Sequence, residues 1–126
     1  MIYVKINSTE YQATINGKVQ DGQWDNRESK AITMEGTFTE VDALFQDGTP
    51  WSIVQRDEVP QYNEKTGEPV LNENGNPVMT DKVTEFDNSE FCIRGDLAVH
   101  VDGSCTVKMG KYTDLETAYE LMYGGM

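Results

Sequence analysis

The sequence predicts a single, mostly β domain: a small antiparallel β-sandwich or partly open barrel of about seven or eight strands, with two short helices. Short runs in which apolar and polar residues alternate recur along the chain, separated by Gly, Asn and Asp turn signals. Residues 91–109 read as a β-hairpin with one apolar and one polar face, a pattern typical of antiparallel sheets with one side in water. With 126 residues, the whole chain, 1–126, is expected to form one domain around one core.

The register of this hairpin can be predicted from its apolar pattern. A three-residue connection at 101–103 places Val99 opposite Cys105 and Leu97 opposite Val107, so that apolar side chains share one face. A two-residue turn would instead set apolar residues against polar ones. The last residue of the three-residue connection is a glycine, and this loop position requires a left-handed backbone, which glycine adopts easily.

The other strands are expected where the alternation returns. They cover 2–6, 11–15, 19 onward, 31–38, 51–55 and 83–86. Asn16-Gly17 is a strong hairpin signal, and it predicts a tight turn between the second and third of these strands. The polar stretch 24–29 is interpreted as a loop, and 83–86 is expected to pair with 55–62.

Two helices are predicted where the apolar period changes. Thr39 is expected to cap a short helix over 40–46, with acidic residues in its first turn. A C-terminal helix is predicted over 114–123, because Thr113 and Glu116 fit a capping box and the glycines at 124–125 end it. The apolar stripe of this helix is Leu115, Ala118, Tyr119 and Met122. A helix this short is marginal alone, so it must dock on the sheet or on a partner.

Residues 63–78 are the least globular stretch and are predicted to form a protruding finger or a flexible loop. The two halves echo each other, and each half reads as a turn rich in Asn and Gly. Because the stretch has few apolar residues to bury, it needs a partner or tolerates mobility. The candidate partner-binding residues are Tyr62, Asn63, Thr66, Asn72, Asn74 and Asn76 in the finger and Leu115, Tyr119 and Met122 in the C-terminal helix.

Charge is the outlying feature of the composition, with 22 acidic against 10 basic residues and a net charge of −12. This argues against nucleic acid and anionic membranes as partners, since phosphate binding requires clustered Lys and Arg. The charge permits a basic protein partner, and its simplest interpretation is solubility.

The cysteines and the N-terminus predict a reducing environment. Cys92 and Cys105 are expected to face opposite sides of their strands and to stay free thiols, which suits a cytosol or a particle assembled there. The first residues become polar by Asn7, so no signal peptide is expected. No apolar run approaches the roughly 20 residues of a membrane-spanning helix.

No catalytic constellation is recognisable, and we predict no enzyme, no cofactor and no metal. The sole histidine, His100, is expected on the polar face of the hairpin beside Ser104. A two-residue turn would place it opposite Cys105 and leave a thiol–imidazole pair open. Arg94-Gly95-Asp96 spells the cell-adhesion tripeptide, but Gly95 is expected to serve as a bulge or bend in a strand.

Two stretches offer oxygen ligands for calcium, and a weak site stays open at either. The first, 21–28, lacks the alternating spacing of a calcium loop, and the second, 72–76, brings Glu73 as its one charge. Aromatic residues that could stack on sugars are Trp24, Trp51, Tyr62 and Tyr112. Trp51 leads an apolar run and is expected in the core.

A set of short motifs runs through most of the chain. They are Trp24-Asp25, Arg27-Glu28-Ser29-Lys30, Trp51-Ser52-Ile53-Val54, Asp87-Asn88-Ser89, Asp102-Gly103 and Val107-Lys108-Met109-Gly110-Lys111. In these motifs the chain resembles small uncharacterised proteins of phages and prophages in gut Firmicutes, encoded among tail and other structural genes. The likeness is looser at 63–78. No activity or catalytic residue is established for that set, so none is carried over.

The resemblance implies a component of a virion or of its assembly. The predicted function is therefore a phage structural or assembly module, associated with the tail, that acts through protein–protein contacts. Its partners would be other virion or assembly proteins, a homo-oligomer stays open, and its location would be the host cytoplasm during assembly or the virion. Two alternatives remain: an acidic anti-defence inhibitor that mimics nucleic acid, and a carbohydrate-binding module for host-surface glycans.

Overall fold

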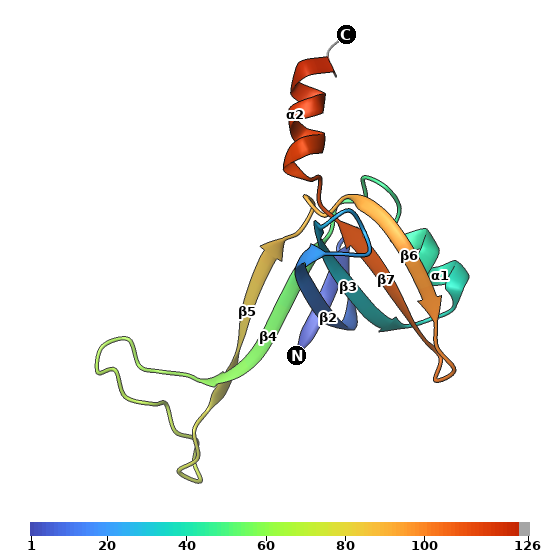
Figure 1. Ribbon diagram of the computed structural model, residues 1–126. Helices are drawn as coiled ribbons and strands as arrows, with labels where there is room; N and C mark the ends of the chain where they lie inside the picture. Colours follow the sequence, from blue (N-terminus) through green and yellow to red (C-terminus); the bar gives the residue numbers. More distant parts are fainter. Residues whose placement is uncertain (124–126) are drawn as a thin grey trace.

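Seven strands form one antiparallel sheet in the computed structural model, which describes residues 1–123 (Figure 1). The strands are β1 (Ile2–Ile6), β2 (Thr9–Asp21), β3 (Arg27–Glu35), β4 (Ser52–Pro60), β5 (Met79–Asp87), β6 (Ile93–Val99) and β7 (Ser104–Gly110), and the helices are α1 (Phe38–Leu44) and α2 (Asp114–Tyr123). The strand order is β5-β4-β1-β2-β3-β7-β6, so β5 and β6 form two open edges. The predicted mostly β class with two short helices is confirmed, and one open sheet is nearer to the predicted partly open barrel than to a sandwich.

The long strand β2 joins the two halves of this sheet. Its residues 9–12 pair with β1, and its residues 13–21 pair with β3. The turn before it, at Asn7 and Ser8, has positive φ angles of 51° and 68°. Two positive φ angles in a two-residue turn match the right-handed twist of the flanking strands.

The core lies between the sheet and α1. Val41 and Phe45 from the helix segment pack against buried side chains of β1, β3 and β7. Trp51 lies in the core, as expected, and donates its indole N–H to the backbone carbonyl of Phe91 at 3.0 Å. The edge of its ring meets Phe45, with the ring centroids 5.8 Å apart, an arrangement that aromatic quadrupoles favour.

The β6–β7 hairpin has the predicted register. Leu97 pairs with Val107 and Val99 pairs with Cys105. Gly103 closes the three-residue connection with a φ of +89°, in the left-handed region predicted for it. The expected bulge or bend at Gly95 is also confirmed, because the register shifts between Arg94 and Leu97.

The hairpin predicted at Asn16-Gly17 is wrong. Both residues lie inside β2, opposite Ala31 and Lys30 of β3. The chain turns later, at 22–26, where Asp25 and Asn26 have positive φ angles. Consequently the strand expected from residue 19 is the end of β2, and β3 begins at residue 27, inside the stretch 24–29 predicted as a loop. Continuous pairing with β3 outweighs the local preference of Asn-Gly for a turn.

The first helix begins and ends two residues earlier than predicted. Its cap is Thr37, not Thr39, and it covers residues 38–44 instead of 40–46. The Thr37 hydroxyl accepts the N–H of Glu40 at 3.2 Å, and the Glu40 carboxylate accepts the N–H of Thr37 at 3.3 Å. This reciprocal pair is a capping box, and it selects the threonine that has a glutamate three residues later. The C-terminal helix has the predicted bounds, while the glycines at 124–125 lie outside the described residues.

The strands β4 and β5 extend away from the rest of the sheet as a two-stranded ribbon that ends in the finger (Figure 1). The predicted pairing of 83–86 with 55–62 is confirmed in part: Val83 and Thr84 lie opposite Arg56 and Gln55, but the next two residues lie opposite 54 and 53. The strand predicted over 51–55 is longer than expected and continues to Pro60. In the outer part of the ribbon most side chains of both strands are exposed, so the ribbon adds little to the core.

We expect Phe45→Ala to lower the free energy of unfolding by about 3–5 kcal/mol, because it removes a fully buried ring and leaves a cavity. Phe38→Ala is the matched control: Phe38 is 49% exposed, and its removal should cost only about 0.5 kcal/mol. Urea unfolding followed by circular dichroism measures both. Equal losses in the two variants would contradict the assignment of the core.

Candidate interaction site

The C-terminal helix begins in the capping box that the sequence predicted. The Glu116 N–H donates to the Thr113 hydroxyl at 3.2 Å, and the Thr113 N–H donates to the Glu116 carboxylate at 2.8 Å. Two of the free N–H groups at the helix start are satisfied in this way. The N-terminus of α2 is therefore capped by its own side chains.

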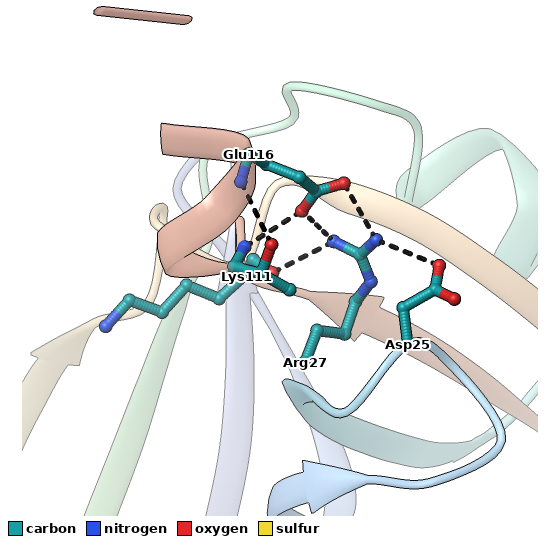
Figure 2. A network of polar contacts seen from close by, with 5 residues as sticks. Asp25, Arg27, Lys111 and Glu116 are labelled. Atoms are coloured by element: carbon teal, nitrogen blue, oxygen red, sulfur yellow. Dashed lines mark hydrogen bonds and ion pairs between the residues drawn. The ribbon is translucent and has the colours of Figure 1, made fainter. Parts of the chain in front are cut away.

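The same carboxylate also anchors the helix to the sheet (Figure 2). Nη1 and Nη2 of Arg27 donate to the two carboxylate oxygens of Glu116 at 2.8 and 3.0 Å, a bidentate pair. Nη1 also donates to the backbone carbonyl of Lys111 at 3.1 Å, just before the helix. Arg27 is the first residue of β3, so the anchor joins the start of α2 directly to the sheet.

Arg27 is held in place from its other sides. Its side chain is only 5% exposed, and its guanidinium carbon lies 5.0 Å from the centre of the Trp24 ring. The carboxylate of Asp25 is 3.7 Å from Nη2. Within the described part of the chain, Nε of Arg27 is the one buried side-chain nitrogen or oxygen without a hydrogen-bond partner. The guanidinium thus uses the fork of its two terminal nitrogens for binding.

Trp24 in turn rests on glycine backbone. A Cβ atom added at Gly95 of β6 or Gly110 of β7 would lie only 2.8 or 2.7 Å from the indole ring. These two glycines let the ring approach the sheet closely.

Arg94, the residue before Gly95, donates to the carboxylate of Asp42 at 2.6 Å and to the carbonyl of Phe45 at 2.8 Å. Arg94 and Gly95 of the adhesion-like tripeptide are therefore used inside the fold, whereas Asp96 is exposed.

The charges of the anchor reinforce each other. Hydrogen bonds from Arg27, and next from the Thr113 backbone, lower the pKa of Glu116 from 4.5 to about 2. Glu116 in turn raises the pKa of Arg27. Close by, Lys108 donates to Asp21 at 2.7 Å, which lowers the pKa of this buried carboxylate. Both carboxylates are ionised throughout the physiological pH range.

The anchored helix carries its apolar stripe in solvent. Leu115, Tyr119 and Met122, three of the predicted contact residues, are 81%, 64% and 68% exposed. Their positions on the helix wheel cluster on one side, whereas Glu116 faces the sheet. Figure 1 shows α2 pointing away from the sheet. The sequence predicted that this helix docks either on the sheet or on a partner. Because the stripe does not lie on the sheet, docking on a partner stays a prediction.

The finger is an ordered two-lobed structure. Three backbone hydrogen bonds of 2.8 Å close a ring at its base, in which Gln61 donates to Val78, Val78 to Val70, and Val70 to Gln61. The lobes cover 62–69 and 71–77, and one isolated β-bridge closes each of them. The two consecutive turns predicted from the sequence echo are confirmed. The segment projects from the end of the β4–β5 ribbon (Figure 1).

The predicted finger residues divide into two groups. Asn63 and Asn72 accept backbone N–H groups of their own turns, at 2.8 and 3.3 Å and at 2.9 and 3.1 Å respectively. Thr66 accepts the N–H of Glu68 at 3.3 Å. These three side chains shape the lobes. Tyr62, Asn74 and Asn76 are exposed and are the finger residues better placed for contact.

The finger and α2 project from different ends of the molecule (Figure 1). The structure thus does not bring the predicted contact residues together into one site; it separates them into two. Two further large apolar side chains are exposed near the stripe of α2: Leu121, on the other side of the helix, and Tyr112, just before it.

The groups that nucleophilic chemistry would need lie apart. His100 is exposed on the polar face, as expected, with Nε2 2.7 Å from the Thr106 hydroxyl. The backbone N–H of His100 donates to the backbone carbonyl of Ser104. His100 therefore lies opposite Ser104 and not opposite Cys105. Cys105 is buried and Cys92 is half-buried, and both are free thiols, as predicted.

Two of the residues considered for calcium, Asp21 and Asn72, already have partners for their side-chain oxygens. Asp21 accepts hydrogen bonds from Lys108, Ser29 and the N–H of Gln23. Asn72 accepts two backbone N–H groups within its own turn. Among residues 1–123, no three His, Cys, Asp or Glu side chains gather in a group that could hold a metal ion.

Sequence reasoning found the capping box but missed the anchor. Arg27 and Trp24 fell in a stretch that was interpreted as a loop, and no local pattern links a residue at 27 with one at 116. One local signal of the anchor was available. Trp24 and Arg27 lie three residues apart, and an aromatic ring and a guanidinium this close in sequence often stack.

No family model, no curated protein and no solved structure matches the chain. Among the described residues, no helix is long and apolar enough to cross a membrane.

We expect the anchor to weaken in acid. Because the pKa of Glu116 is lowered from 4.5 to about 2, its contribution is complete above about pH 5 and is lost as the pH falls toward 2. Glu116→Gln should remove on the order of 1 kcal/mol at pH 7 and should abolish this pH dependence. Backbone ¹⁵N relaxation measures the outcome: α2 should gain independent motion in the variant, while β3 and β7 stay rigid. Unchanged relaxation of α2 would contradict the anchor.

In the finger, we expect Asn72→Ala to loosen the second lobe, because two backbone N–H groups lose their acceptor. Amide hydrogen exchange of residues 72–76 should accelerate. Asn74→Ala is the matched control, since this exposed residue is in the same lobe and its side chain is not required for the turn. If both variants exchange alike, Asn72 does not shape the lobe.

Proposed function

We propose that the protein is an assembly component that acts through protein–protein contacts, with the exposed stripe of α2 as its main contact surface. The observation that carries this proposal is the combination of a firm anchor with an exposed apolar face. An ion pair and a capping box fix the direction of the helix, yet the side chains of its stripe remain in solvent. Amphipathic helices of this kind bind by laying their apolar side into a groove.

Charge supports a partner with a basic surface. At least six of the ten Lys and Arg side chains form ion pairs with acids of the same chain, which leaves an excess of acids to face outward. Besides Glu116, α2 carries Asp114 and Glu120 and no basic residue. An apolar groove with Lys or Arg at its rim would complement both features of the helix.

The setting that we propose is a phage particle, near its tail, or the host cytoplasm in which the particle is assembled. This part rests on the resemblance of the short motifs and not on the geometry of the fold. The proposed partners are other virion or assembly proteins. The projecting finger supplies a second contact surface, at the other end of the molecule from α2.

The two alternatives, nucleic-acid mimicry and glycan binding, remain predictions. Trp51, one of the residues considered for stacking on sugars, is buried in the core. No feature of the surface favours either alternative specifically.

The direct test replaces the gene in its phage or prophage. We expect a Leu115→Asp, Met122→Asp double variant to lower the yield of complete particles at least about tenfold, because each change places a charge in the contact surface. Thr117→Asp, on the side of the same helix that faces away from the stripe, is the matched control and should support normal yield. Electron microscopy and infectious titre count the particles. Normal yield from the double variant, with its fold intact by circular dichroism, would contradict the proposal.

A further inference from the structure

The two edges of the sheet are protected unequally. At the β6 edge, the N–H of Arg94 donates to the Asp47 carboxylate at 2.7 Å, and the carbonyl of Cys92 accepts the N–H of Gly48 at 2.8 Å. The loop after α1 thus covers the start of this edge. The β5 edge is nine residues long and lies last in the strand order, and almost all of its side chains are exposed. Among residues 1–123, no strand pairs with its outer side.

The backbone groups that point outward from β5 can be assigned. Hydrogen bonds from Asn88 to Trp51 and from Gln61 to Val78 bracket the β4–β5 ladder at its two ends, with the same pairing register. In an antiparallel ladder, hydrogen-bonded and non-hydrogen-bonded pairs alternate. Even-numbered residues of β5 therefore bond to β4, and odd-numbered residues 79–87 direct their N–H and C=O groups outward. An edge of this kind can accept another strand.

Charge disfavours a second copy of this chain as that strand. Two-fold antiparallel pairing centred on Lys82 would oppose two lysines, and centring on Val83 would oppose Asp81 with Glu85 of the other copy. Centring on Thr84 would oppose Asp81 with Asp87. Because directly opposed like charges destabilise strand pairs, each of these registers is unfavourable.

One acid on this edge has an unfavourable neighbour within the ribbon itself. Asp81 lies directly opposite Glu58 of β4, in a non-hydrogen-bonded pair, where the side chains of paired residues are closest. On the same face, Asp87 adds negative charge, whereas Glu85 is ion-paired with Lys5 at 3.0 Å, and the apolar Met79 and Val83 are about half exposed. A basic side chain opposite Asp81 would lie next to both acids of the pair.

We propose that the outer side of β5 is a strand-addition site for an extended segment of another protein that carries Lys or Arg opposite Asp81 and Asp87 and an apolar residue opposite Val83. The outward backbone groups supply the hydrogen bonds, and the side chains on the acidic face select the sequence. This site is separate from the stripe of α2 and adds a second class of partner to the proposed function, namely a basic β-strand.

A synthetic peptide tests this site with the intact protein. The probe is a nine-residue peptide with Lys opposite Asp81 and Asp87, Glu opposite Lys82, and Val or Thr elsewhere. The control peptide has its Lys and Glu residues exchanged. We expect the basic peptide to bind at least about tenfold more tightly than the control in calorimetry. Hydrogen exchange of the outward amides, at odd positions 79–87, should slow when the basic peptide is bound.

Two variants separate this site from other modes of binding. Val83→Pro removes one outward N–H and leaves the β4 ladder intact, so it should abolish the slowing of exchange. Asp81→Lys keeps every backbone donor and should reduce the preference for the basic peptide, because one of the acids that favour it is replaced by a like charge. The Leu115→Asp, Met122→Asp variant should bind the peptide like the parent protein, which distinguishes failure here from failure of the proposed role of α2. Equal binding of both peptides, protection of amides elsewhere, or a dimer of the protein alone that Asp81→Lys disrupts would overturn the proposal.

Discussion

The bidentate pair between Arg27 and Glu116 determines how the C-terminal helix is attached to the sheet. Glu116 caps its own helix and binds the sheet at the same time, so one carboxylate sets both where α2 begins and how the helix is attached. Arg27 can do this because Trp24 covers it, and Trp24 can lie so close because Gly95 and Gly110 have no side chains. The direction of the C-terminal helix therefore depends, through Trp24 and Arg27, on two glycines of the sheet.

The distribution of large apolar side chains follows from a small core. The core takes its residues from β1, β3, β7 and the α1 segment, and the remaining large apolar side chains include two groups, one on α2 and one along the β4–β5 ribbon and finger. A monomer would not benefit from ordered projections that expose apolar surface. Contiguous exposed apolar surface marks sites of contact in soluble proteins. The two groups coincide with the two places where we infer that partners bind.

The sequence predicted what depends on local pattern and neighbouring strands. The register of the β6–β7 hairpin, the Thr113–Glu116 capping box and the two turns of the finger all follow from residues close together in the chain. It failed where distant residues decide, because pairing with β3 draws Asn16-Gly17 into a strand. The shifted first helix was a missed local signal, since the glutamate that favours Thr37 over Thr39 as the cap lies three residues after Thr37. The anchor joins residues 89 positions apart, which no local pattern can show.

The central claim is that α2 is held rigidly to the sheet while its apolar stripe remains in solvent. Residual dipolar couplings, together with the relaxation of methyl signals by a soluble paramagnetic probe, test both halves on the free protein. The account predicts that amides of α2 and of the sheet fit one alignment tensor, and that the probe strongly relaxes the methyl groups of Leu115 and Met122. A separate tensor for α2, or methyl groups shielded from the probe, would contradict it.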